Sequence, residues 1–296
     1  MRNYQFKNFL DMWYLMRLAI IVAGLTLIGC TDKPEKNGWT KDNLNGKVKS
    51  YSEFSYKAED VFGKIEKEGR EREISEENDF QNIFDKKGNL IEVNKYNSDG
   101  CLISKTIYEY DEEEKLNGFS IYNSEGSLDS KIVKTDKSEK SIVFNGFFTD
   151  GSLAGKWVLT FDENDNMIEQ ITYDVDGSIY SGFSYKYDEM GNKIEMVEYI
   201  SDKSIKNKST YKYDEMGNKI KENRYNSSDS LISMFSFKYD EMGNLIEKIS
   251  FKSDNSFDSI STFIYEFDNR NNWTRKIKFT NKFPKYILER EYVYYK

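Results

Sequence analysis

The stretch YKYDEMGNKIE at residues 185–195 returns as YKYDEMGNKIK at residues 211–221 and as FKYDEMGNLIE at residues 237–247. A fixed period of this length is typical of repeat architectures, in which one supersecondary unit stacks on the next. The aromatic residue before the Asp, or its substitute, recurs at Phe84, Tyr110, Thr135, Phe161, Tyr187, Tyr213, Tyr239 and Phe267. Eight copies at steps of 25 to 28 residues therefore predict a structural repeat across most of the chain.

Each unit begins with the residue types that a tight turn requires. Asp188 can accept a hydrogen bond from the backbone two residues further on, Gly191 permits positive φ, and Asn192 tolerates the left-handed region. We assign a structural role, as turn or anchor, to Tyr187, Asp188, Gly191, Asn192, Tyr213, Asp214, Gly217, Asn218, Tyr239, Asp240, Gly243 and Asn244. A second turn follows about ten residues later, as in YNSDG at residues 96–100, so one unit contains two turns and two strands.

The strand that returns to each turn alternates aromatic and polar residues. Phe183, Tyr185 and Tyr187 share one face because side chains in a strand point alternately to opposite sides. Stacked units place these aromatic rings in ladders, where cross-strand pairs contribute roughly 0.2 to 1 kcal/mol each. The motif recurs because every copy presents the same turn and the same aromatic ring to the neighbouring copy.

Composition agrees with strands throughout. The 296 residues include 22 Tyr, 20 Phe and only 2 Pro, a balance that suits pleated strands. The apolar fraction of 38% is thin for a thick globular core of this length. We therefore expect an all-β fold over residues 51–296: an elongated or spiralling antiparallel β-sheet meander of about eight 26-residue two-strand repeats, with open edges that favour pairing between chains.

The N-terminus carries a secretory signature. An Arg at position 17 precedes the apolar run at residues 18–28, which is too short to span a membrane and suits the core of a signal peptide. The ending Leu27-Ile28-Gly29-Cys30 resembles the lipobox of bacterial lipoproteins. That resemblance implies removal of residues 1–29 and a lipid anchor on Cys30, whether translation begins at Met1 or at Met16.

The resemblance also implies a place in the cell. Residues 30–50 are polar and are expected to tether the repeat domain to a membrane of the cell envelope. Thr31, rather than Asp, after the lipidated Cys favours the outer membrane or cell surface over the inner membrane.

Charge argues against nucleic acid as a partner, and cysteine content argues against an intramolecular disulfide. Removal of residues 1–29, which carry three positive charges and one negative charge, changes the net charge from −8 to about −10. Nucleic acid is therefore not an expected partner. Once Cys30 is lipidated, Cys101 is the one remaining thiol, so no intramolecular disulfide can form.

The motif YxYDxxGNxI, seen at residues 185–194 and 211–220, resembles the YD repeat of the Rhs family and of bacterial wall-associated proteins. The resemblance covers about residues 78–280. It implies a long antiparallel sheet that coils into a spiral, which in large members encloses a toxin and in small ones forms a surface binding module. By this comparison we expect no toxin domain after the repeats and too few units to close a shell. The DGSL turns also resemble MORN-type repeats, which supply a meandering sheet.

Catalytic and metal sites find little support in the residues. His, the commonest general base and metal ligand, is absent from the chain. Asp188, Asp214 and Asp240 recur with the scaffold, which indicates turn capping rather than a pair of glycosidase carboxylates. The segment DENDN at residues 162–166 resembles a calcium loop, but Met167 stands where an EF-hand requires Gly. We expect no cofactor.

Three functions stay open at this stage. The first is a non-catalytic binding or structural module, anchored by lipid in the envelope, with a glycan or a protein as ligand. The second is a toxin-associated or immunity factor, and the third is a carboxylate-based glycoside hydrolase. Residues 136–157, where the repeat degenerates, are the region most expected to form a special surface.

Overall fold

The computed structural model describes residues 37–69 and 79–296 of the chain, and their structure is almost entirely antiparallel β-sheet. The prediction of an all-β fold is confirmed. One short helix, α2 (Gly38–Lys41), precedes the strands. The strands are β1 (Val48–Val61), β2 (Lys64–Lys67), β3 (Asp79–Phe84), β4 (Leu90–Tyr96), β5 (Leu102–Tyr110), β6 (Leu116–Asn123), β7 (Leu128–Lys137), β8 (Ser141–Phe148), β9 (Leu153–Phe161), β10 (Met167–Tyr173), β11 (Ile179–Tyr187), β12 (Lys193–Ile200), β13 (Ile205–Tyr213), β14 (Lys219–Asn226), β15 (Leu231–Tyr239), β16 (Leu245–Lys252), β17 (Phe257–Phe267), β18 (Trp273–Thr280) and β19 (Phe283–Tyr294).

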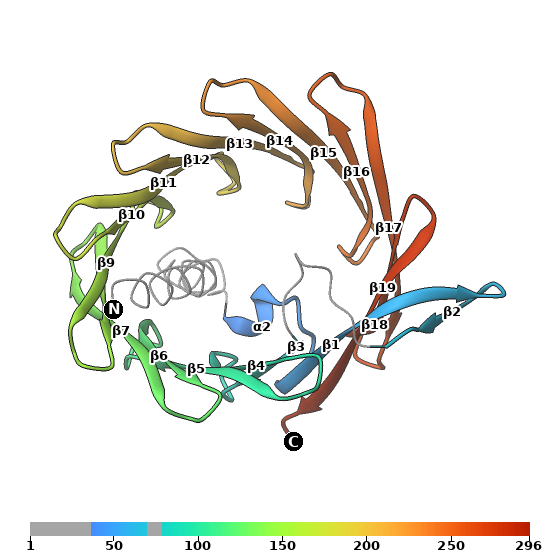
Figure 1. Cartoon of the computed structure of the whole chain (residues 1–296), viewed down its shortest axis with the longest axis horizontal. Helices are drawn as coiled ribbons and strands as arrows, with labels where there is room; N and C mark the ends of the chain where they lie inside the picture. The colour runs from blue at the N-terminus through green and yellow to red at the C-terminus, as the bar shows by residue number, and fades with distance from the viewer. Residues whose placement is uncertain (1–36, 70–78) are drawn as a thin grey trace, which may run out of the picture.

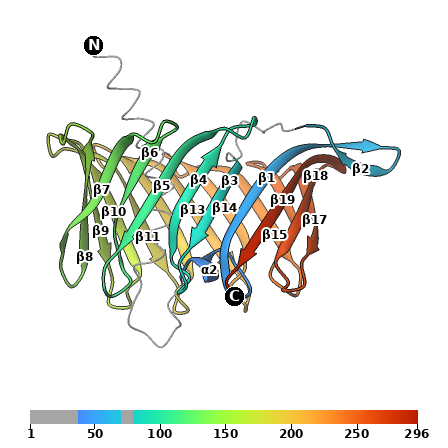
Figure 2. The ribbon, with the colours of Figure 1, turned by 90° about the horizontal axis from the view of Figure 1, so that it is seen from below.

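The sheet closes on itself into a barrel. From β3 onward each strand pairs with the next strand in the chain, and β1 pairs with β3 on one side and with β19 on the other. The ring therefore has 18 strands, all those described except β2 (Figure 1). Figure 2 shows that the strands are inclined to the barrel axis and that hairpin turns line both rims.

Closure corrects the prediction of an elongated or spiralling sheet with open edges. Successive strands do pair as a meander, but the two ends of the meander meet. Ser50 to Lys57 of β1 form a continuous register with Val293 to Tyr286 of β19. The sequence repeat describes only how one unit contacts the next, and the twist that accumulates from strand to strand decides whether the ends meet. The expectation that the units are too few to close was therefore wrong.

The turn motif forms one rim of the barrel, which we call the Asp rim. In the copy at residues 188–192, the amide of Asp188 donates to the Asn192 carbonyl and the amide of Gly191 donates to the Asp188 carbonyl. Gly191 has φ +79°, which a residue with a Cβ adopts at a cost. This is a type I turn closed by a left-handed residue and a bulge, a common three-to-five-residue hairpin connection.

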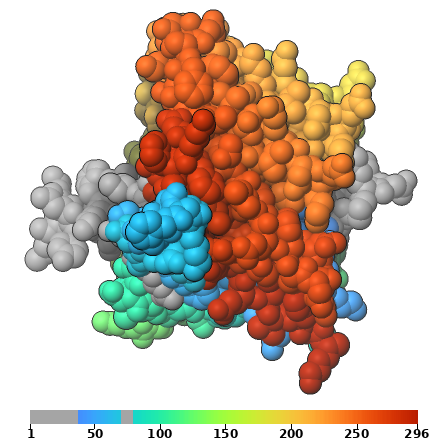
Figure 3. All heavy atoms as spheres, turned by 90° about the vertical axis from the view of Figure 1, so that its right-hand side faces the viewer, coloured from blue at the N-terminus to red at the C-terminus, as the bar shows by residue number. Residues whose placement is uncertain are grey.

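The first hairpin leaves the ring and crosses the outside of the wall. Residues 58–61 of β1 pair with β2, and Figure 3 shows this hairpin lying against the C-terminal strands. Ile65 of β2 packs on a small cluster formed by Ala58, Ile277 and Ile287. The Arg275 guanidinium donates to the Ile65 carbonyl at 3.3 Å, so the hairpin acts as an outer brace across β18 and β19.

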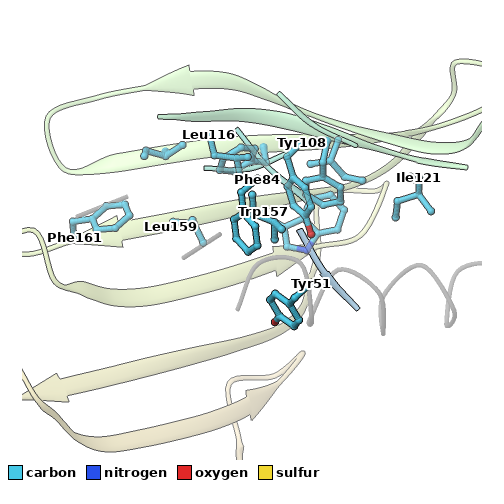
Figure 4. Packing of buried hydrophobic residues seen from close by; sticks show 14 of the residues in the cluster. Tyr51, Phe84, Tyr108, Leu116, Ile121, Trp157, Leu159 and Phe161 are labelled. Carbon is cyan, nitrogen blue, oxygen red and sulfur yellow. The ribbon is translucent and has the colours of Figure 1, made fainter. Parts of the chain in front are cut away.

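The main hydrophobic cluster lies on the inner side of the first half of the ring (Figure 4). Its buried members run from Val48 in β1 to Phe161 in β9 and include Tyr51, Phe84 and Trp157. Trp157 is 3% exposed and lies against Gly146, where an added Cβ would come within 2.9 Å of the indole ring. Residues 136–157, expected to form a special surface, therefore contain β8 and the first part of β9 and supply part of this core.

The N-terminal predictions fall on both sides of the described region. Cys30 and the signal segment lie outside the described residues. Residues 37–47, within the stretch expected to be a tether, contain α2 and contact the barrel wall. Among the described residues, no helix is long and apolar enough to cross a membrane.

Candidate binding site on the inner face of the barrel

The segment that carries α2 lies within the ring and identifies the inner face of the wall (Figure 1). The Asn37 side chain caps α2 by accepting from the Thr40 amide at 3.2 Å. The Trp39 indole nitrogen donates to the Val48 carbonyl at 2.7 Å, which fixes the helix to β1. The Tyr51 hydroxyl then donates to Asp42 Oδ2 at 2.8 Å. The face of β1 that carries Tyr51 is therefore the inner face.

The strand register carries this assignment around the ring, because directly opposite residues share a face. Tyr51 lies opposite Tyr292 of β19, so Tyr292 also faces inward. Repeating this comparison from each strand to the next assigns the inner residues of every repeat. The inner face of the second half of the wall carries Phe183, Tyr185, Tyr187, Tyr211, Tyr213, Phe235, Phe237, Tyr239, Phe263, Tyr265, Phe267, Tyr286, Tyr292 and Tyr294. Most of these rings are half-buried, so they stay accessible from inside the barrel.

The outer face of the same wall carries ion pairs between neighbouring strands. Lys186 lies directly opposite Glu195 and pairs with it at 2.7 Å. Lys238 lies directly opposite Glu247 and pairs with it at 2.6 Å. The alternation along each strand thus directs most of the repeated aromatic rings inward, whereas Lys186 and Lys238 point outward with their carboxylate partners.

A row of tyrosine hydroxyls joins successive turns along the Asp rim. The Tyr213 hydroxyl donates at 2.7 Å to the carbonyl of Lys193, the first residue after the turn of the preceding hairpin. The same bond, 2.7 to 2.9 Å long, is made by Tyr110, Tyr187, Tyr213, Tyr239, Tyr265 and Tyr292. In the last repeat it comes from Tyr265 rather than from the expected anchor Phe267, because the final step is 28 residues instead of 26. These hydroxyls are thus occupied by the scaffold.

Two aspartates show what the repeated turn carboxylates do. Asp188 Oδ1 accepts from the amides of Met190 and Asn192 at 3.0 and 2.8 Å, and its Oδ2 accepts from the Asn192 side chain at 3.1 Å. Asp162 lies in the segment compared with a calcium loop. Its carboxylate accepts the same set of bonds, from the backbone of Asn164 and Asn166 and from the Asn166 side chain. Within the ranges 37–69 and 79–296, no group of three acidic or Cys side chains is arranged to hold a metal.

A polar pocket of about 370 Å³ lies at the Asp rim, between the α2 segment and the wall from β15 to β19. Its walls include residues 42–45, the turns at residues 242–245 and 271–273, and the inner side chains Tyr265 and Arg290. Five Asn residues line it: Asn43, Asn45, Asn244, Asn271 and Asn272. Accessible rings beside converging amides are typical of sites that bind polar ligands with apolar faces.

Arg290 lines this pocket together with Asp42. Its Nε lies 2.8 Å from Glu53 Oε2, and its guanidinium stacks between two rings, 4.4 Å from the centre of Tyr51 and 4.0 Å from that of Trp273. Burial acts to lower the pKa of Arg290, but the nearby Tyr51 and Glu53 outweigh it and raise the pKa above its ordinary value. Burial likewise raises the pKa of Tyr265 to about 12. Neither group changes protonation near neutral pH, which favours recognition over acid–base chemistry.

The link between the α2 segment and the wall is made by amides. The backbone N–H of Asn45 donates to Asn272 Oδ1 at 2.7 Å, and Asn272 Nδ2 donates back to the backbone carbonyl of Asn45 at 2.9 Å. Asn272 is the turn Asn of the last repeat, so a residue type chosen for the turn also anchors the inner segment.

Sequence reasoning identified the inner aromatic rows but not the pocket. Tyr265 and Tyr292 stand at nearly regular steps from Tyr239, so the repeat itself could have placed them on the same face. Arg290 and Asp42 lie outside the repeat motif, and only closure of the ring brings them together. Cys101, the other cysteine considered, is exposed.

Comparisons with known proteins assign this chain to no family. No protein family and no curated protein matches the sequence. A porin-like protein from Bacteroides uniformis aligns over 84% of this chain and 99% of its own, with 10% identity and a TM-score of 0.43. A porin-like protein from Bacteroides vulgatus aligns over 84% of this chain and 98% of its own, with 12% identity and a TM-score of 0.38. A crystal structure of TcdB2-TccC3 aligns over 73% of this chain and 14% of its own, with 15% identity and a TM-score of 0.27.

Proposed function

We propose that this protein is a non-catalytic binding module of the cell envelope, anchored by lipid at Cys30, which holds an extended glycan against the inner face of its barrel. The observation that carries the proposal is the inward direction of the aromatic rows in β11 to β19, together with the polar pocket at the Asp rim. The flat faces of Tyr, Phe and Trp side chains suit the apolar C–H faces of sugar rings, and amides suit the hydroxyl groups at the ring edges.

The outer face supports a wall that meets water rather than lipid. A membrane-spanning barrel carries an apolar outer band about 25 Å tall, and a Lys or Arg at its midplane costs about 2 to 4 kcal/mol. Here Lys186 and Lys238 lie on the outer face within their strands and pair with Glu195 and Glu247. On this proposal the lipid at Cys30, and not the wall, attaches the protein to the membrane.

The inner rows can be tested with one pair of matched tyrosines. Tyr211 lies on the inner face with Lys193 and Lys219 near its ring, at 5.8 and 5.3 Å, whereas Tyr225 lies on the outer face with Lys208 at 4.8 Å. We expect Tyr211→Ala to weaken binding in a panel of neutral and acidic linear oligosaccharides by about fivefold, since one stacked ring contributes on the order of 1 kcal/mol. Tyr225→Ala should leave binding unchanged.

The measurement is isothermal titration calorimetry on the purified full-length chain and both variants, with thermal melting as the check on folding. Equal losses from both variants, or no binding by the parent protein to any member of the panel, would contradict the proposal. The anchor is tested separately: Cys30→Ser should move the protein from the membrane fraction to the soluble fraction of the cells that produce it.

A further inference from the structure

Four successive repeats each place at least one lysine over an aromatic ring on the inner face. Lys193 of β12 lies 5.1 Å from the ring centre of Tyr185, and Lys219 of β14 lies 4.8 Å from that of Phe237. The series continues with Lys248 of β16, 4.5 Å from Phe235, and Lys276 of β18, 5.0 Å from Phe263. We call these four residues the lysine ladder. Each member comes from the first strand of a repeat and rests on a ring from an adjoining strand.

The ladder carries more positive charge than the inner wall neutralises. Glu222 is 6% exposed and is held by two cations, Lys219 at 2.6 Å and Arg224 at 2.6 Å. Within the described part of the chain, neither Lys193 nor Lys248 forms an ion pair with a carboxylate. Burial, and after it the neighbouring Lys219, lowers the pKa of Lys193; burial, and after it Arg224, lowers the pKa of Lys248. The cations are thus close enough to repel one another, and an anion placed among them would relieve that repulsion.

The distance between successive lysines of the ladder can be compared with the repeat length of a ligand. Neighbouring strands in a sheet lie about 4.8 Å apart, so one repeat of two strands advances about 10 Å around the wall. That step is close to the length of a disaccharide unit in an extended polysaccharide. Between successive lysines lie rings that suit sugar faces, such as Tyr211 between Lys193 and Lys219.

From this geometry we infer that the inner wall from β11 to β18 binds a linear acidic polysaccharide that carries one carboxylate or sulfate group per disaccharide unit. The inference rests on the proposed glycan-binding function and adds the class of glycan. The acidic groups of the ligand lie among the cations of the ladder, most directly at Lys193 and Lys248, and each intervening ring receives a sugar face. Single-stranded nucleic acid fits less well, because it carries a charge on every unit and the chain as a whole is acidic, with a net charge of −8.

The test compares two ligands that differ only in charge. Heparosan oligosaccharides alternate glucuronic acid with N-acetylglucosamine, and reduction of their carboxyl groups converts each uronic acid to a neutral hexose. The purified full-length chain should bind native heparosan at least tenfold more tightly than the reduced form. The excess should shrink as salt rises from 50 to 500 mM, since charge-assisted contacts are screened.

The matched protein variants remove two charges from either face of the wall. Lys193→Met with Lys248→Met keeps the apolar stems on the rings and should abolish the preference for the native ligand. Lys186→Met with Lys238→Met removes the same charge from the outer face and should preserve it. Both double variants should keep the parent melting profile, because none of the four lysines lies in the main hydrophobic cluster.

The outcomes separate the inference from the function on which it rests. Equal binding of native and reduced heparosan would overturn the acidic class and leave glycan binding intact. No binding of either ligand, or of any oligosaccharide in the neutral and acidic panel, would overturn both. Tight binding of oligo(dT) that depends on Lys193 and Lys248, in the absence of heparosan binding, would also overturn the inference by showing a different polyanion.

Discussion

The two halves of the ring share one strand pattern but use their inner faces differently. In β1 and β3 to β9, which we call the packed arc, the inner side chains form the main hydrophobic cluster, from Val48 to Phe161. In β11 to β18, the repeat arc, the inner rings stay half-buried and alternate with lysines. The near-identical sequence copies all lie in the repeat arc, and the degenerate copies lie in the packed arc.

This difference shows what keeps a repeat regular. In the repeat arc each ring contacts mainly its neighbours in the wall, so every copy meets the same surroundings and the same residues suit each one. In the packed arc the inner side chains also pack on the α2 segment and on one another, and each position then requires its own volume. Sequence regularity therefore marks the part of the wall whose inner rings stay half-buried.

The largest expected contrast is in core truncation. Trp157→Ala in the packed arc should lower the free energy of unfolding by about 3 to 5 kcal/mol, because it removes a buried ring and leaves a cavity. Phe237→Ala in the repeat arc should cost roughly half as much, since the ring is only half-buried. Urea unfolding followed by tryptophan and tyrosine fluorescence measures both. Equal costs would show that the two arcs are packed alike.

Acid should act mainly through the repeated turns. Burial opposes ionisation of Asp162, but hydrogen bonds from Asn166 and Asn164 outweigh it and lower its pKa; backbone and side-chain bonds from Asn192 lower the pKa of Asp188. A carboxyl whose pKa is lower in the folded state stabilises the fold above its unfolded pKa, and that stability is lost as pH falls through the folded pKa. The melting temperature should therefore fall steeply below about pH 4, which is near the unfolded value for Asp.

A variant pair identifies the groups responsible. Asp188→Asn with Asp214→Asn should flatten the acid limb of the melting-temperature curve, whereas Asp129→Asn on an exposed strand position should not. If the double variant melts with the same pH profile as the parent, the turn carboxylates do not control acid stability.

The rim hydroxyls are expected to make a smaller contribution. Tyr213→Phe removes the bond to the Lys193 carbonyl and should cost about 1 kcal/mol, the usual net value of one hydrogen bond, without disturbing the ring. The packed arc offers its own reference, because Phe161 occupies the equivalent anchor position without a hydroxyl. A loss well above 2 kcal/mol at Tyr213 would show that the row of hydroxyls acts cooperatively.

The outer ion pairs should matter least. Lys238→Gln removes an exposed partner of Glu247 and should change the free energy of unfolding by less than about 0.5 kcal/mol. The measurement is the same urea titration, repeated at 50 and 500 mM salt. A loss above 1 kcal/mol would contradict an outer face in free contact with water.

The sequence predicted the local structure well and the global closure poorly. Turn preferences and strand alternation depend only on residues that are close together in the sequence. These short-range patterns were enough to predict the turn at Asp188 and Gly191 and the alternating rings of β11. Closure depends on the small twist and tilt added at each strand, and no single residue encodes their sum. The same holds for the pocket, because Asp42 and Arg290 are neighbours only after β1 has paired with β19.

The pairing of β1 with β19 also sets a rule for how such a chain can change. An open solenoid can gain or lose a unit at either end, and its remaining units keep their neighbours. A ring cannot, because one inserted 26-residue unit adds two strands to a circumference that the first and last strands must still complete. The α2 segment, joined to the wall by Asn45 and Asn272, would then span a wider interior. Duplication of one repeat unit is the simplest way to lengthen this sequence. Once the barrel has closed, a further duplication would disrupt the pairing of the first strand with the last.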